Sequence, residues 1–161
     1  TKTQVKLRWK DKNTGLHMLG YADGESVWRG MQAVVELKTA SNTDPQKWVR
    51  DSKYMDYPFQ TGVYLTGYEK TKYQFPIFLY IVVDTTPPYG SYLIFAGQDW
   101  VDFGKSEVDG TLKAFNYCVE NGYWNESWDF RLLHTREYFS TDVHRYFTRV
   151  FSEPDILEPN K

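Results

Sequence analysis

Two charged residues stand inside a short hydrophobic segment, Ala33–Ser41, with the sequence AVVELKTAS. In a β-strand successive side chains point to opposite faces, so Glu36 and Lys38 share one face. Val35 and Leu37 then point into the opposite layer. A carboxylate and an ammonium on a mostly buried strand are costly unless they are paired, hydrated or bound to a metal ion. The segment therefore predicts a buried strand that carries a functional site.

A second acid, Asp23, lies thirteen residues before Glu36, ahead of the loop GESVWRG (Gly24–Gly30). A hairpin through this loop would return Asp23 beside Glu36. Together with Lys38, the two acids would form an Asp…Glu-x-Lys metal site for cutting phosphodiesters. The alternative is a surface pair of Glu36 and Lys38 on an edge strand, with Asp23 in a glycine-containing turn. Because Glu-x-Lys is common, this motif alone does not separate the two hypotheses.

The chemistry of phosphodiester cleavage explains this choice of residues. It requires a nucleophilic water, neutralised charge on the phosphate and a stabilised leaving oxygen, all of which a carboxylate-bound divalent metal can supply. Mg²⁺ suits such a site, with Mn²⁺ as an alternative ion, because it prefers oxygen ligands and keeps some of its waters. Asp23 and Glu36 would be the side-chain ligands, and the carbonyl of Leu37 would add another oxygen. Lys38 would contact the attacking water or the phosphate and favour the anionic nucleophile.

Length and composition favour one globular domain over residues 1–161. The formal charge of −2 gives no global basic field, so any DNA binding must rest on a local patch and on metal ions. The lone Cys118 cannot form an internal disulfide, which favours a reducing compartment, and we expect the cytoplasm. No apolar run approaches the ~20 residues that span a bilayer, so we expect no membrane partner. The first residue, Thr1, begins no signal peptide and suggests a start inside a longer protein.

The pattern of apolar residues predicts strands and helices in a mixed order. Strands are expected at Gln4–Lys10, Leu16–Ala22, Ala33–Thr39, Pro76–Thr85 and Tyr92–Phe95. Helices are expected at Pro45–Met55, from Pro58 to Glu69, from Asp99 to the stop signal Asn121–Gly122, and at Thr141–Phe151. This order predicts an α/β (α+β) fold, a mixed central β-sheet flanked by helices.

The second predicted helix adds two polar residues to the candidate site. Gln60 and Tyr64 are four residues apart and therefore lie on the same helix face. An amide beside a hydroxyl would hold a metal-bound water or a phosphate oxygen near Glu36. In the alternative interpretation Tyr64 packs in the core and Gln60 is solvated.

Taken in order, these motifs resemble one enzyme superfamily. The segments GYAD and VVELKTA, a W-x-x-D-x-x-Y helix and YPFQTGVYL are similar to the PD-(D/E)XK nucleases, in the RecB-like and RecE-like branch that carries a Gln-x-x-x-Tyr helix. The segments FLYIVVDTTPPYG and CVENGYW extend the likeness to the phage and prophage RecE-like exonucleases. The resemblance covers roughly Leu16 to Trp128.

The resemblance implies a restriction-endonuclease-like core and a metal-dependent deoxyribonuclease, typically a 5′-to-3′ exonuclease that prepares duplex ends for recombination. It assigns Asp23 and Glu36 as metal ligands, Lys38 as the catalytic lysine, and Gln60 and Tyr64 as the Gln-x-x-x-Tyr pair. Related nucleases often form rings around DNA, so a homo-oligomer and a recombination partner protein are expected in a bacterial or phage-infected cell.

One departure from the family leaves alternatives open. Such nucleases usually carry an acid or His on an N-terminal helix, and no such helix precedes Gln4. A catalytically inactive nuclease-fold domain that binds DNA or serves assembly is therefore one alternative, and a sequence-specific endonuclease is another. His17 is a further candidate near the site, although packing is the simpler role. The cations Lys47, Arg50 and Lys53 would contact the DNA backbone or form a solvated face.

Overall fold

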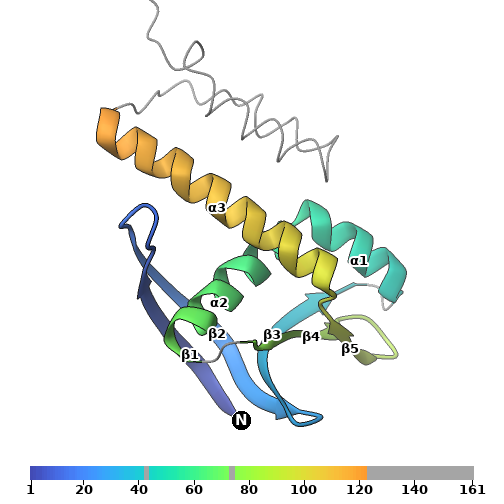
Figure 1. Cartoon of the computed structure of the whole chain (residues 1–161). Coiled ribbons are helices and arrows are strands. Elements are labelled where there is room, and N and C mark those ends of the chain that lie inside the picture. Colours follow the sequence, from blue (N-terminus) through green and yellow to red (C-terminus); the bar gives the residue numbers. More distant parts are fainter. Residues whose placement is uncertain (42–43, 73–74, 123–161) are drawn as a thin grey trace, which may run out of the picture.

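The computed structural model describes residues 1–41, 44–72 and 75–122 (Figure 1). In this part of the chain the elements follow in the order β1 (Lys2–Lys10), β2 (His17–Trp28), β3 (Met31–Ala40), α1 (Pro45–Tyr54), α2 (Tyr57–Thr71), β4 (Ile77–Asp84), β5 (Ser91–Phe95) and α3 (Gln98–Asn121). The helix predicted at Thr141–Phe151 lies outside the described residues. The strands form a mixed sheet with the helices packed on one face, so the predicted α/β (α+β) class is confirmed.

The sheet has the strand order β1-β2-β3-β4-β5. Neighbouring strands run antiparallel, except β3 and β4, which are parallel. A parallel pair needs a long crossover connection, and here α1 and α2 provide it. The crossover places α2, which carries Gln60 and Tyr64, over the sheet in which Glu36 lies.

Strand β2 is longer than the sequence predicted. It continues to Trp28, and a two-residue turn at Arg29 and Gly30 leads into β3. Both turn residues have positive φ, of 50° and 80°, as expected for turns that match the twist of a hairpin. The loop predicted at Gly24–Gly30 is therefore wrong, because pairing with β3 keeps most of this segment extended. Asp23 lies inside a strand and not in a turn.

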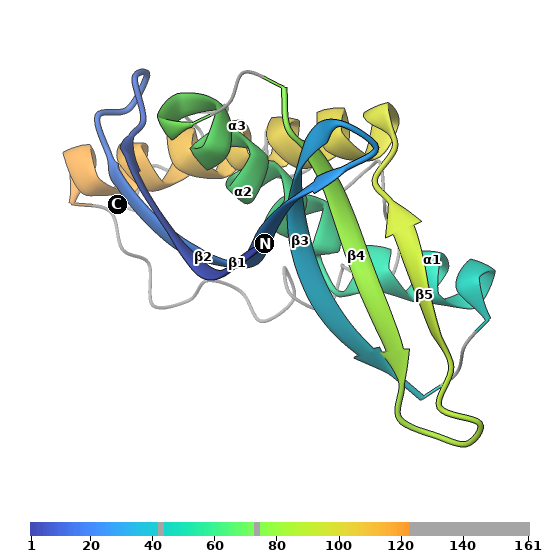
Figure 2. The ribbon, with the colours of Figure 1, turned by 90° about the horizontal axis from the view of Figure 1, so that it is seen from below.

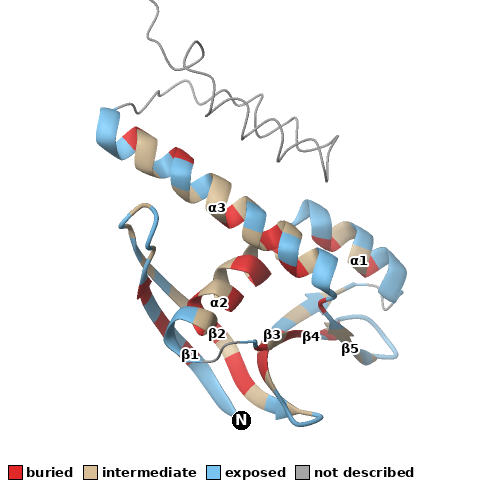
Figure 3. Cartoon of the chain, viewed as in Figure 1, coloured by how far each residue is buried: buried red, intermediate tan, exposed pale blue. Residues whose placement is uncertain are grey.

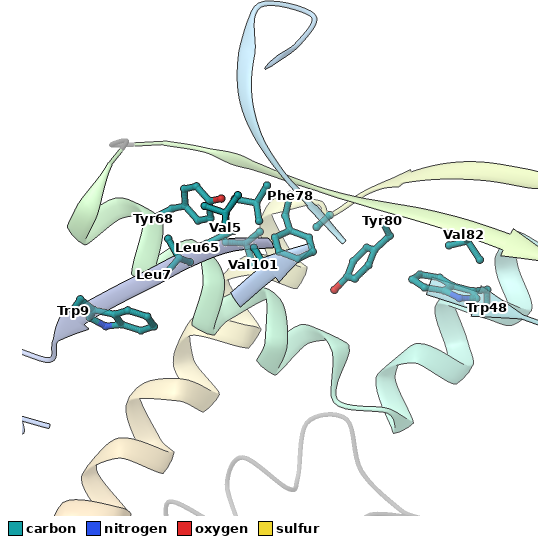
Figure 4. Close-up of a cluster of buried hydrophobic side chains, with 13 residues drawn as sticks. Val5, Leu7, Trp9, Trp48, Leu65, Tyr68, Phe78, Tyr80, Val82 and Val101 are labelled. Carbon is teal, nitrogen blue, oxygen red and sulfur yellow. The ribbon is translucent and has the colours of Figure 1, made fainter. Parts of the chain in front are cut away.

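The hydrophobic core fills the space between the sheet and the helices. In β1 the side chains of Val5, Leu7 and Trp9 are buried and alternate with exposed residues, as the period of two requires (Figure 3). The Trp9 ring lies so close to α2 that a Cβ on Gly67 would approach it to 2.8 Å. Figure 4 shows the core extending from Trp9 on the β1–β2 hairpin to Trp48 on α1.

Helix α3 crosses α2 where each helix has a glycine. A Cβ added to Gly104 would lie 1.9 Å from the carbonyl oxygen of Pro58, and one added to Gly62 would lie 2.3 Å from the carbonyl carbon of Gly104. The two backbones are therefore in direct contact, and no side chain fits between them. This contact fixes the position of α2 above the sheet.

The buried stripe of α3 is made largely of small residues. Val101 and Val108 are buried, but Phe115 and Val119 are 47% and 49% exposed. Smaller residues are buried in addition: Gly104, Ala114 and Cys118. A close crossing explains this difference, because it favours small residues on the contact face. No helix among the described residues is both long and apolar enough to cross a bilayer.

The helices cover the face of β3 on which Glu36 lies. The sequence had instead predicted a second layer on the opposite face, under Leu37. Glu36 is buried, whereas Leu37 is 53% exposed on the open face of the sheet. Leu37 is in register with Ile81 on β4 and, through it, with Leu93 on β5, and both of these are also exposed. No helix among residues 1–41, 44–72 and 75–122 packs on this side, so the predicted second layer under Leu37 is absent there.

Candidate active site

The candidate site lies where two neighbouring strands separate. Strands β2 and β3 pair only from the turn as far as Gly24 and Val35. Beyond this point β2 stays with β1 and β3 stays with β4, so the β1–β2 hairpin curves away from the rest of the sheet (Figure 2). Asp23 lies at this divergence, and its Oδ2 accepts a hydrogen bond of 2.9 Å from the backbone N–H of Leu37. We call this place the fork. The Asp23 carboxylate accepts there the backbone hydrogen bond that the carbonyl of a paired strand would otherwise accept.

Glu36, Lys38 and Gln60 form one hydrogen-bonded network beside the fork. The Lys38 Nζ donates to Glu36 Oε1 at 2.9 Å and to Gln60 Oε1 at 2.8 Å. The Gln60 Nε2 donates to the same Glu36 oxygen at 2.6 Å. The side chains of Glu36 and Lys38 are only 6% and 14% exposed, so the alternative of a surface ion pair is wrong. Gln60 is likewise not simply solvated.

The second carboxylate oxygen of Glu36 takes no part in this network. Its Oε2 is buried and has no hydrogen-bond partner among the described residues. Buried polar atoms are almost always bonded, and an exception calls for an unseen water or ion. A buried carboxylate oxygen is also the ligand type that Mg²⁺ and Mn²⁺ prefer. The residues at the fork therefore fit a divalent cation.

Tyr64 is held at the same place from the helix side. Its hydroxyl donates to the carbonyl oxygen of Tyr21 at 2.8 Å, and its ring lies above Gly20, where a Cβ would approach it to 3.2 Å. Burial raises the pKa of Tyr64, and the negative charges of Glu36 and Asp23 raise it further, against a lowering hydrogen bond from Gln60. Both carboxylates thus act on one hydroxyl, and this hydroxyl stays protonated.

The five predicted site residues therefore meet at the fork, but the possible metal ligands are few. Among the described residues there is no group of three or more His, Cys, Asp and Glu side chains that could hold a metal ion. In this described part, the carboxylate oxygens at the fork come from Asp23 and Glu36 alone. His17 adds none, because it is exposed at the start of β2, six residues from Asp23 and hence ~20 Å away at ~3.4 Å per residue.

Three other charged residues form local contacts with near neighbours in the sequence. The carboxylate of Asp84 accepts hydrogen bonds from the backbone N–H and the hydroxyl of Thr86, so it caps the turn that follows β4. On α1, Lys47 and Arg50 both pair with Asp51.

Sequence reasoning missed Tyr57, whose ring centroid lies 4.4 Å from the Lys38 ammonium. Its aromatic face favours the cation. An aromatic residue three positions before Gln60 is on the same side of the helix, and this spacing was the available signal.

A buried network below the site was also missed. The Tyr80 hydroxyl donates to the carbonyl of Tyr57 at 2.9 Å, and the Trp100 Nε1 bonds the hydroxyls of Thr61 and Tyr80 at 3.2 Å and 3.4 Å. Burial raises the pKa of Tyr80 to about 12, so this hydroxyl stays neutral. Since Tyr80 pairs in register with Glu36, the network ties α2 and α3 to the strand beside the site.

The sequence of this chain matches a known protein family. Residues 25–127, nearly two thirds of the chain, match the model of a PDDEXK-like domain of unknown function, DUF3799. The chain belongs to this family. The match to the PDDEXK-like domain contains Glu36, Lys38, Gln60 and Tyr64, and it begins two residues after Asp23. A search of curated proteins found no match.

One solved structure shares the fold of this chain. A crystal structure from Eubacterium rectale, described as a "putative exonuclease", has 20% sequence identity and a TM-score of 0.58, and the alignment covers 87% of this chain. The crystal structure of SSO0001 has 14% identity and a TM-score of 0.42 over 86% of this chain. This chain spans 53% and 60% of the lengths of these two proteins. The first similarity supports the nuclease-like fold.

Proposed function

We propose that this PDDEXK-like domain is a metal-dependent deoxyribonuclease, and specifically a RecE-like exonuclease that acts on duplex ends. The observation that carries the proposal is the Oε2 atom of Glu36, a buried carboxylate oxygen without a hydrogen-bond partner among the described residues. It lies in a network with a lysine and beside the fork that Asp23 occupies. Carboxylates that hold a divalent metal next to a lysine would supply what phosphodiester hydrolysis requires.

The proposed ligands are oxygens of Asp23, Glu36 and the backbone of Leu37. A residue in a strand directs its N–H and its C=O to the same neighbouring strand. The N–H of Leu37 bonds Asp23, so its carbonyl is directed toward the fork as well. A bound Mg²⁺ or Mn²⁺ would supply Lewis acidity and a more acidic water at this place.

Lys38, Gln60 and Tyr64 would hold the positive charge and the strands of the site in place. The Lys38 ammonium, held by Glu36, Gln60 and the Tyr57 ring, presents a fixed positive charge to the scissile phosphate or to the attacking water. Gln60 holds both Lys38 and Glu36, because its amide oxygen accepts from Lys38 and its amide nitrogen donates to Glu36. Tyr64, protonated and bonded to β2, keeps the separated strand at a constant position over the helix.

A second candidate function is a non-catalytic nuclease-fold domain that binds DNA or serves assembly. It is favoured by the small ligand set, because only two carboxylates meet among the described residues. The Lys38–Glu36–Gln60 network also satisfies most of its own hydrogen bonds without an ion.

The deciding experiment incubates the chain with end-labelled linear duplex DNA in Mg²⁺, Mn²⁺ or EDTA. We expect degradation only with metal, and a loss of about 100-fold or more in Glu36→Gln and Lys38→Ala. Asp109→Asn and Lys113→Ala are matched controls, because this exposed pair lies on α3 away from the fork. Degradation at the parent rate by Glu36→Gln would refute the proposal.

Two further measurements separate the alternatives. Titration calorimetry with Mn²⁺ should detect binding that Glu36→Gln weakens, and a parent chain that neither binds Mn²⁺ nor cleaves DNA supports the non-catalytic candidate. Covalently closed circular DNA should resist the enzyme, because an exonuclease needs an end, whereas cutting of the circle would indicate an endonuclease. Ring assembly and a recombination partner protein stay predictions.

A further inference from the structure

Three cations lie in a row on the open face of β1. Lys6, Arg8 and Lys10 are exposed and alternate with the buried side chains that face α2. Alternate residues of a strand are ~6.8 Å apart, so the row spans ~14 Å. This length corresponds to about four phosphates of one DNA strand, at ~3.4 Å of helix axis per phosphate.

In the part of the chain that the structure describes, no acid pairs with the cations of this row. Lys6, Arg8 and Lys10 form no ion pair within residues 1–41, 44–72 and 75–122, whereas Lys47 and Lys113 pair with acids on their own helices. Unpaired cations at regular spacing are available to an external polyanion.

Charge is also unevenly distributed along the chain. The first 22 residues contain five Lys and Arg residues and one Asp, although the whole chain has a net charge of −2. The β1–β2 hairpin, built mostly from these residues, is therefore a basic element on an otherwise acidic protein. A local patch of this kind is what an overall acidic chain needs to bind nucleic acid.

The row begins next to the fork. Lys6 pairs in register with Tyr21, and its ammonium lies 5.9 Å from the centroid of that ring. The carbonyl of Tyr21 accepts the hydrogen bond of Tyr64, and Asp23 follows two residues later. The other end of the row, Lys10, lies near the hairpin tip. Tyr21 and Asp23 lie on the same face of β2 by the alternation of a strand. A backbone that follows the row from tip to base therefore arrives at Asp23 at the fork.

From these observations we infer that the open face of the β1–β2 hairpin binds the phosphate backbone of the DNA substrate and guides it to the fork. The inference rests on the proposed function and adds the residues that hold the substrate. Contacts to phosphates position DNA without reading sequence, so binding at Lys6, Arg8 and Lys10 is sequence-independent. The cations on α1 that the sequence suggested for this role are less suitable, since two of them pair with Asp51.

The test compares two triple variants with the same change in charge and residue type. The first is Lys6→Gln/Arg8→Gln/Lys10→Gln on β1, and the control is the α1 triple Lys47→Gln/Arg50→Gln/Lys53→Gln. Binding of a fluorescent 30-bp duplex is measured by anisotropy in EDTA over a range of salt concentrations, so that no cleavage occurs. Thermal unfolding of each variant verifies the fold.

We expect the β1 triple to bind on the order of 100-fold more weakly at 0.1 M salt. The slope of log K against log salt should fall in magnitude by ~2.7, because three phosphate contacts contribute ~0.9 each. The α1 triple should keep the parent slope. A charge-conserving variant, Lys6→Arg/Lys10→Arg, should bind like the parent. The inference is overturned by a β1 triple that keeps the parent slope, by an equal loss in the α1 triple, or by a parent that does not bind DNA.

The assay separates this inference from the proposed function. A parent that binds DNA through the β1 row but never cleaves it would refute the nuclease and support the binding face. A parent that cleaves DNA, with a β1 triple that binds as tightly as the parent, would refute the binding face alone.

Discussion

The glycine contact between α2 and α3 yields a quantitative prediction about stability. Replacing Gly104 with Ala places a methyl group 1.9 Å from the carbonyl oxygen of Pro58, where ordinary contacts begin near 3.4 Å. The backbones must therefore move apart by about 1.5 Å, the difference between these distances. Gly110, six residues further along the same helix, has open space around its Cβ position and is the matched control.

The magnitudes follow from two opposing contributions. Ala is favoured over Gly inside a helix by ~1 kcal/mol, so Gly110→Ala should stabilise the chain by about that amount. Gly104→Ala has the same gain, but overpacking costs ~3 kcal/mol because backbone cannot move aside as a flexible side chain does. The net effect is a loss of ~2 kcal/mol, or a Tm lower by about 4–8 °C for a chain of this size.

Urea and thermal unfolding, followed by circular dichroism, measure the difference between the two variants. We expect Gly110→Ala to be more stable than Gly104→Ala by ~3 kcal/mol. Equal stability of the two variants would refute the backbone contact at the crossing. Because Gln60 lies on the helix that must shift, Gly104→Ala should also weaken any cleavage activity, whereas Gly110→Ala should not.

Three further predictions concern single side chains. Lys38→Ala should abolish cleavage and reduce the free energy of unfolding in urea by ~1–3 kcal/mol, because it leaves the buried Glu36 with one donor fewer; unchanged cleavage would contradict the role of Lys38. Hydrogen bonding to Lys72 holds the pKa of Glu25 below its usual 4.5, so this stabilisation is present above about pH 4.5 and is lost as pH falls through the folded-state pKa. In Glu25→Gln the unfolding midpoint should therefore depend less on pH in acid, and an unchanged pH profile would contradict this. Trp100→Phe should lower stability by ~1 kcal/mol in thermal unfolding, since its Nε1 donates to two buried hydroxyls, and no loss would show that this donor contributes nothing.

Local features of the fold could be predicted from the sequence. The alternation of Val5, Leu7 and Trp9 predicted the buried face of β1. The helix expected from Pro45 does begin there, and the Asp44 side chain caps it by accepting from the N–H of Gln46 at 3.0 Å. These features depend on residues within one or two turns of one another, which is the range that spacing rules cover.

Features that depend on packing could not be predicted. The segment after Asp23 contains turn residues, yet pairing with β3 keeps most of it in a strand. The exposed side of Leu37 depends on which sheet face the crossover helices cover. The glycine contact depends on where two helices cross, which no spacing in either helix encodes.

The candidate site was predictable to a similar extent. The spacings of Glu36 with Lys38 and of Gln60 with Tyr64 placed each pair on a common face. The hydrogen bond between Lys38 and Gln60 joins residues 22 positions apart and became visible only in the structure. The separation of β2 from β3, which lets Asp23 reach Leu37, is likewise a property of the whole sheet.

Leu37 offers the site only its main chain, and this has a consequence for mutational studies. Its peptide N–H holds Asp23 while its isobutyl group faces the other way, so most replacements at this position would leave the site intact. A scan of side chains would therefore score position 37 as dispensable. Only proline, which lacks the N–H, would reveal the contribution of this residue.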